Sequence, residues 1–172
     1  MTGVRKSLAK VEVALRWDPS ASGTPAHDLD IVAAVFGADD PHGAPVYVVY
    51  FGNRAPDGTI TLHRDSRTGQ GFGYDELMTL ELDRMSDRLT RVVVGVVIQG
   101  GAKTFGQISG TGIRIREGAT DLVQDDLAAV ADATEATLAV FTRDASGGWS
   151  LDPALRGFTS GPEEFTRVMG AA

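Results

Sequence analysis

The sequence predicts a mainly β protein, a two-sheet β-sandwich with a few short helices. Many short segments alternate apolar with polar residues, turns rich in glycine and proline separate them, and helical spacing is confined to the later part of the chain. With 172 residues and 42% hydrophobic content, the chain can bury one well-formed core but is short for two. We therefore expect one domain over residues 1–172.

The first half of the chain predicts strands separated by turns. Val11, Val13 and Leu15 alternate with Glu12 and other residues of lower hydrophobicity, which predicts a half-buried strand over residues 11–17. Pro56-Asp57-Gly58 has the chemistry of a hairpin turn. Further strands are expected at residues 31–36, 46–51, 59–63 and 78–82.

The second half predicts more strands and one helix. Residues 92–98 form the most apolar segment of the chain, which predicts a strand buried on both faces. Shorter strands are expected at residues 112–116, 134–143 and 149–151. Residues 121–133 are ambiguous, because their apolar residues keep helical spacing over a narrow stripe. A helix is expected to begin at Pro162, which two acids follow.

Composition excludes several classes of function. The net charge of −7 and the pI near 4.9 argue against direct nucleic-acid binding, which needs clustered Lys and Arg. The absence of cysteine excludes disulfides and thiolate chemistry. The sequence has no apolar run near the roughly 18 residues of a transmembrane segment, and its start lacks the features of a signal peptide. We expect a cytoplasmic protein without a transmembrane segment.

Two acidic segments predict a metal site. The loop that begins at His63 carries Asp65, three glycines at alternate positions, and the pair Asp75-Glu76. Asp28-Leu29-Asp30 opens an earlier strand, where two acids two residues apart point to one side. Acids that converge in this way repel one another unless a cation lies between them. A hard ion such as Ca²⁺ takes six to eight oxygens from carboxylates and carbonyls. The alternative is a solvated surface turn.

Other chemistries have less support in the sequence. Asp65 and Glu76 have the end spacing of an EF-hand loop, but Arg67 and Gly69 occupy ligand positions and strands flank the loop. A dinucleotide fingerprint fails at Tyr74. A nest of backbone N–H groups could bind an anion, but the neighbouring acids would repel it. No serine lies in a nucleophile-elbow sequence, and the three histidines lie beside acids or turns.

Several motifs together resemble one known family over nearly the whole chain. They are Trp17-Asp18, Asp28-Leu29-Asp30, Phe51-Gly52-Asn53, Pro56-Asp57-Gly58, Asp65, Arg67-Thr68-Gly69, Gly71, Gly73, Asp75-Glu76, Phe105-Gly106-Gln107-Ile108 and the glycine-rich stretch 157–161. In this combination the chain resembles the tellurium-resistance TerD domain of bacterial stress-response proteins.

The resemblance implies a TerD-like β-sandwich that binds calcium through the acids of both segments. The implied ligands are the side chains of Asp28, Asp30, Asp65, Asp75 and Glu76, with loop carbonyls such as that of Gly71. It also implies a non-catalytic role in resistance to tellurite and other chemical stresses. The expected partners are the calcium ion and other stress-response proteins, in a membrane-associated or multiprotein complex.

The chain departs from the family pattern in its loops. Ser66, Gln70 and Tyr74 replace an Asn, a Glu and an Asp, Phe72 stands where an acid is common, and Gly52 replaces an Asn. The family pattern implies two calcium ions. Because the charge of the ligands sets calcium affinity, we expect one weaker site in this chain. Two alternatives stay open: a metal-free degenerate copy acting as a protein-interaction scaffold, and a metal-dependent enzyme that handles phosphoryl groups or nucleotides.

Overall fold

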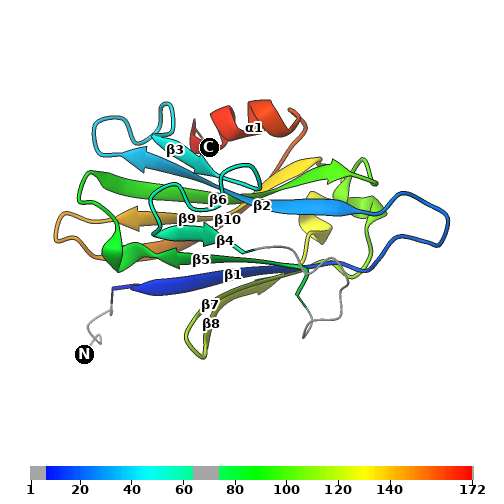
Figure 1. Cartoon of the computed structure of the whole chain (residues 1–172), viewed down its shortest axis with the longest axis horizontal. Helices are drawn as coiled ribbons and strands as arrows, with labels where there is room; N and C mark the ends of the chain where they lie inside the picture. Colours follow the sequence, from blue (N-terminus) through cyan, green and yellow to red (C-terminus); the bar gives the residue numbers. More distant parts are fainter. Residues whose placement is uncertain (1–6, 64–73, 172) are drawn as a thin grey trace.

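Two antiparallel five-stranded sheets pack face to face in the computed structural model, which describes residues 7–63 and 74–171 (Figure 1). This confirms the predicted β-sandwich. The first sheet has the strand order β4 (Ile60–Leu62), β5 (Glu76–Glu81), β1 (Lys10–Arg16), β7 (Gly112–Glu117) and β8 (Thr120–Asp125). The second has the order β10 (Trp149–Phe158), β9 (Glu135–Arg143), β6 (Leu89–Gly100), β2 (Asp28–Gly37) and β3 (Tyr47–Val49).

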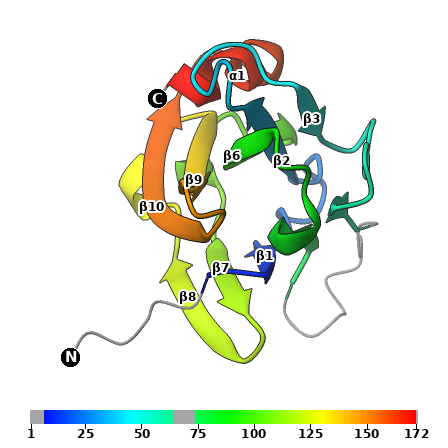
Figure 2. The ribbon, with the colours of Figure 1, turned by 90° about the vertical axis from the view of Figure 1, so that its left-hand side faces the viewer.

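The main core lies between the two sheets. Figure 2 shows these sheets in a view along the strands. Alternate residues of each strand point into this core, in agreement with the period of two in the sequence. From the first sheet these include Val11 and Val13 of β1 and Met78 of β5, and from the second Leu29 and Ile31 of β2.

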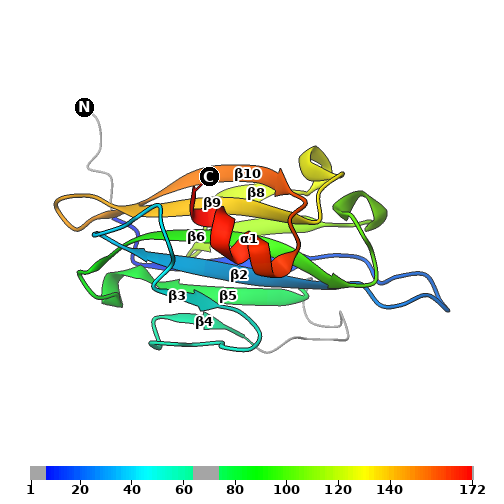
Figure 3. The ribbon, with the colours of Figure 1, turned by 90° about the horizontal axis from the view of Figure 1, so that it is seen from above.

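A second core covers the outer face of the second sheet. Helix α1 (Pro162–Val168) and the short 3₁₀ helix η4 (Met169–Ala171) lie across β2 and β6 (Figure 3). Phe165 packs over Gly95, where an added Cβ would lie 2.8 Å from the ring, so the close approach requires glycine. β6 therefore has apolar neighbours on both faces, which explains its nearly unbroken apolar run.

Two predicted strands differ in extent from the structure, and one ambiguous segment is resolved. Residues 121–133 are not a helix: β8 forms a hairpin with β7, and η3 (Ala128–Val130) is a single 3₁₀ turn. The last strand runs on to Phe158, past Pro153, which an edge strand with a register shift tolerates. The strand expected at 46–51 is only β3, because Tyr50 and Asn53 close a turn directly after it. Two more 3₁₀ turns, η1 (Leu82–Arg84) and η2 (Phe105–Gln107), connect strands.

A largely buried arginine, Arg143, forms hydrogen bonds with the backbone of the turn between β5 and β6. The Nη1 atom of Arg143 donates to the carbonyl oxygens of Ser86 at 2.9 Å and Leu89 at 3.2 Å, and Nη2 donates to that of Met85 at 3.2 Å. The guanidinium also lies 4.8 Å above the ring of Trp149. These contacts join the turn to β9 and β10. Among the described residues, no helix is long and apolar enough to cross a membrane.

Candidate metal centre

Glu76 is a buried carboxylate that links the two sheets. It opens β5 on the inner face, in line with Met78, and only 3% of its surface is exposed. Its Oε1 accepts a hydrogen bond of 3.1 Å from the backbone N–H of Ile31 in β2. β3 pairs with β2 only over residues 33–35, so this hydrogen bond forms at the open edge of β2, beyond the end of β3. The contact places the Glu76 carboxylate beside the residue that follows Asp30.

Asp75 binds to the first sheet instead. Its Oδ2 accepts a hydrogen bond of 2.8 Å from the backbone N–H of Trp17, and its own N–H donates to the carbonyl of Leu15 at 2.9 Å. The Trp17 indole Nε1 donates to the carbonyl of His27 at 3.2 Å, just before Asp28. Trp17 therefore connects the two acidic segments.

Asp28 and Asp30 lie at the start of β2, and Asp30 is the more buried, with 4% of its surface exposed. They alternate with Leu29 and Ile31, whose side chains belong to the main core. Asp30 pairs with Val97, which belongs to the outer core beneath α1. Asp30 therefore lies on the outer face of the second sheet, while Glu76 approaches the same strand from the inner face. Asp28 is exposed at the end of the strand.

Of the six expected ligands, the structure describes Asp28, Asp30, Asp75 and Glu76, while Asp65 and Gly71 lie outside the described residues. Within residues 7–63 and 74–171, no three His, Cys, Asp or Glu side chains lie together as a metal-binding group. The expected donors are carboxylates and one carbonyl, the oxygen donors that Ca²⁺ takes and soft metals disfavour. The donor chemistry therefore fits calcium, and the four described acids come from the start of β2 and the start of β5.

Tyr74, which stands where the family has an acid, has a different contact. The guanidinium carbon of Arg114 lies 5.6 Å from the centre of its ring, within the range of a cation–π interaction. Arg114 belongs to β7 and pairs with Ala14 of β1. The position next to Asp75 therefore packs against an arginine.

The sequence reasoning missed the backbone partners of this site. The N–H groups of Trp17 and Ile31 hold the two adjacent acids, yet neither residue type signals such a role. The spacing gave one indirect sign, because Trp17 and Ile31 both stand at strand ends beside acidic residues.

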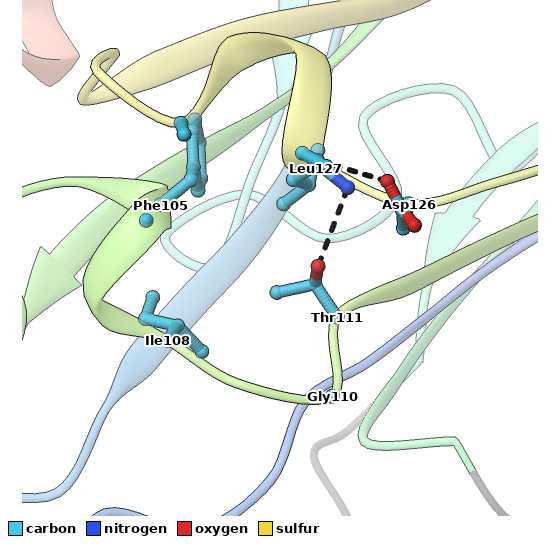
Figure 4. A pocket seen from close by; sticks show the side chains of 9 residues that line it. Phe105, Ile108, Gly110, Thr111, Asp126 and Leu127 are labelled. Carbon is cyan, nitrogen blue, oxygen red and sulfur yellow. Dashed lines mark hydrogen bonds between the residues drawn. The ribbon is translucent and has the colours of Figure 1, made fainter.

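A pocket of about 410 Å³ lies at η2 and η3, away from these acids in the sequence (Figure 4). Phe105, Ile108 and Leu127 supply apolar surface, and the hydroxyl of Thr111 accepts a hydrogen bond of 3.3 Å from the N–H of Leu127. Asp126 is the one ionisable residue among the nine described residues that line it, and its Oδ1 accepts from the N–H of Ala128 at 2.9 Å. Those nine residues contain no pair of an acid or base with a nucleophile activated by it.

Comparison with known proteins agrees with this fold and these motifs. The TerD domain profile matches residues 1–167. The tellurium resistance protein TerD of an Alcaligenes species is 29% identical over 161 residues, covering 90% of this chain and 84% of that protein. TerD of Serratia marcescens is 28% identical with the same coverage.

A solved structure is also similar. The crystal structure of a homologue of the telluride resistance protein TerD from Streptomyces coelicolor A3(2) superposes with a TM-score of 0.90 at 53% identity. The match covers 96% of this chain and 99% of that one. The match to the profile over nearly the whole chain shows that this protein belongs to the TerD domain family.

Proposed function

We propose that this protein is a calcium-binding, non-catalytic stress-response module that acts in a multiprotein or membrane-associated complex in the cytoplasm. One observation carries the calcium part of the proposal. The carboxylate of Glu76 crosses from the first sheet to the N–H of Ile31, the residue after Asp30, so an acid of the later segment lies against the strand that begins with the earlier segment. The names of the curated relatives, tellurium resistance proteins, support a role in resistance to tellurium compounds.

The proposed ligands are Asp28, Asp30, Asp65, Asp75 and Glu76, with the carbonyl of Gly71. A ligand set of several carboxylates from separate segments suits the flexible, high coordination of Ca²⁺ better than the strict octahedron of Mg²⁺. When bound, the ion would supply positive charge between carboxylates that otherwise repel one another. The N–H groups of Trp17 and Ile31 orient two of these acids, Asp75 and Glu76.

Thermal unfolding in Ca²⁺, Mg²⁺ and chelator tests the proposal. Calcium at about 100 times its Kd should add about 2.7 kcal/mol to the free energy of unfolding if the unfolded chain does not bind it, and Mg²⁺ should add little. Isothermal titration calorimetry gives the affinity and the number of ions. Equal melting temperatures in millimolar Ca²⁺ and in chelator would leave the metal-free scaffold as the better description.

Two further measurements address the remaining parts of the proposal. Release of phosphate from nucleotides with Ca²⁺ or Mg²⁺ present would favour the enzymatic alternative over a non-catalytic module. Expression in a tellurite-sensitive bacterium should raise its tolerance to tellurite, and Asp75→Asn should reduce that gain while the protein level stays the same. An equal gain with the variant would separate stress resistance from calcium binding.

A further inference from the structure

Three large apolar side chains project from the surface within only six residues. Val46, Tyr50 and Phe51 are 61%, 39% and 51% exposed, and the other large apolar side chains of the described residues are more buried. They flank β3, the edge strand of the second sheet, on the side of the sandwich where β4 also lies (Figure 3). Single exposed apolar residues are common, whereas such a group marks an interaction surface. We call these three residues the apolar edge.

The backbone holds the two aromatic rings in place before any partner arrives. Tyr50 and Asn53 exchange two backbone hydrogen bonds, of 3.1 Å and 2.9 Å, which close a tight turn. The Tyr50 ring lies over Gly52, where an added Cβ would be 2.6 Å from it, and meets the ring of Phe51 edge to face at 5.5 Å. Aromatic anchors fixed in this way lose little conformational entropy on binding.

Polar contacts fasten the following loop to β3. The hydroxyl of Tyr47 donates to Oδ2 of Asp57 at 2.9 Å, and Oδ1 of Asp57 accepts from the N–H and hydroxyl of Thr59 at 2.9 Å and 2.6 Å. Partial burial acts to raise the pKa of Asp57, but these hydrogen bonds outweigh it and lower the pKa below the usual range. Asp57 therefore stays negatively charged at neutral pH.

Within residues 39–57, which contain the apolar edge, the charged side chains are three aspartates and one arginine. Asp39 and Asp40 lie in the turn before Val46, and Asp57 lies beyond Phe51 in the loop that Tyr47 fastens. Arg54 is the arginine of this segment, and its Nη1 donates to the carbonyl of His63 at 2.9 Å. Carboxylates in this part of the chain favour a positively charged partner, because Lys and Arg pair with acids and stack on the faces of exposed aromatic rings. The same carboxylates repel a negatively charged surface.

We propose that the apolar edge is the docking site for a segment of a partner protein that combines apolar side chains with Lys or Arg. Its apolar residues would cover Val46 and Phe51. Its cations would lie against Asp39, Asp40 and Asp57 and over the aromatic rings. None of the three residues of the apolar edge is among the proposed calcium ligands, and the binding test in chelator does not depend on calcium.

Two synthetic ten-residue peptides that differ only in charge are suitable probes. Both alternate apolar residues with charged ones, with lysine in one peptide and glutamate in the other. Nuclear magnetic resonance titration of the isotopically labelled protein should show shifts at the amides of residues 46–51 with the lysine peptide and none with the glutamate peptide. Phe51→Ser and Tyr50→Ser should each weaken binding at least tenfold, and 0.5 M salt should weaken it further.

Leu122→Ser is the matched control. Leu122 is half-buried in β8, an edge strand of the first sheet that also carries Asp121 and Asp125. This variant should bind the lysine peptide as the unmodified protein does. Circular dichroism shows whether each variant is folded.

Four results would overturn the proposal. The first is that the lysine peptide does not bind. The second is that it binds folded Phe51→Ser as tightly as the unmodified protein, which would mean general attraction to an acidic protein. Self-association that is lost in Phe51→Ser would assign the surface to a second copy of this chain. Phe51-dependent binding to phosphatidylserine vesicles would assign it to a membrane.

Discussion

The contact between Glu76 and Ile31 gives a prediction that separates structure from metal binding. Glu76→Ala removes the acceptor for the N–H of Ile31, a residue with 0% exposed surface. An unsatisfied buried donor costs about 1–3 kcal/mol, and the one lost side-chain methylene adds about 1 kcal/mol, so the variant should lose about 2–4 kcal/mol in chelator. Glu76→Gln keeps an acceptor oxygen and should lose only about 1 kcal/mol, the difference between a charged and a neutral acceptor.

Urea denaturation in chelator and in calcium measures both roles. The unmodified protein should gain about 2.7 kcal/mol in calcium at 100 times its Kd, whereas both variants should lose most of this gain. Glu81→Gln, at the half-buried end of β5, is the control: it removes an ion pair with the exposed Arg84 and should change stability by about 0.5 kcal/mol or less. If Glu76→Gln lowers the free energy of unfolding in chelator as much as Glu76→Ala does, the hydrogen bond to the N–H of Ile31 is not the reason that Glu76 stabilises the fold. If Glu76→Gln keeps the full calcium gain, Glu76 is not a ligand.

The other predictions concern the fold, its pH dependence and the shared ion. Arg143→Met should lower the free energy of unfolding, measured in urea, by about 2–4 kcal/mol, because it removes several charged hydrogen bonds and a cation–π contact. The control Arg84→Met, at an exposed arginine, should lower it by about 0.5 kcal/mol or less. Equal losses in the two variants would contradict this prediction. Burial acts to raise the pKa of Asp57, but its hydrogen bonds make the net shift downward. Ionised Asp57 therefore stabilises the fold at pH values above its unfolded pKa of about 4. This contribution is lost as the pH falls through the lower pKa of the folded state. The stability difference between the unmodified protein and Asp57→Asn should therefore shrink between pH 6 and pH 2, and a constant difference would refute the assignment. Asp30→Asn and Asp75→Asn should each remove most of the calcium response, and the double variant should add little; fully additive losses would mean two separate sites.

Local patterns in the sequence predicted the strands whose side chains point into a core. Alternation identified β1, and the long apolar run identified β6, though the reason for that run is the cover provided by α1. Residues 121–133 stayed ambiguous in the sequence, because three apolar residues at helical spacing also fit a strand followed by a turn. The deciding factor is the pairing of β8 with β7, which local spacing does not reveal.

At the candidate site, residue type and spacing selected the acids, and the structure brings Glu76 to β2 near Asp30. The sequence could not show that Asp75 contacts the N–H of Trp17 while Glu76 contacts that of Ile31. These are backbone contacts across 58 and 45 residues, and a backbone N–H leaves no trace in residue identity. The assignment of Asp28, Asp30, Asp75 and Glu76 as calcium ligands stays a prediction.

Two neighbouring residues, Asp75 and Glu76, reach different sheets, and this has a consequence for hydrogen exchange. The amide protons of Trp17 and Ile31 lie far apart in sequence, yet each is held by a carboxylate at the start of β5. If this strand start detaches in a partial opening, both protons should exchange with solvent through that one opening. Their exchange should then give the same free energy of opening, lower than the free energy of complete unfolding. A ligand that holds the acids in place would slow both amides together. Exchange at these two positions would thus report how often the end of the sandwich opens.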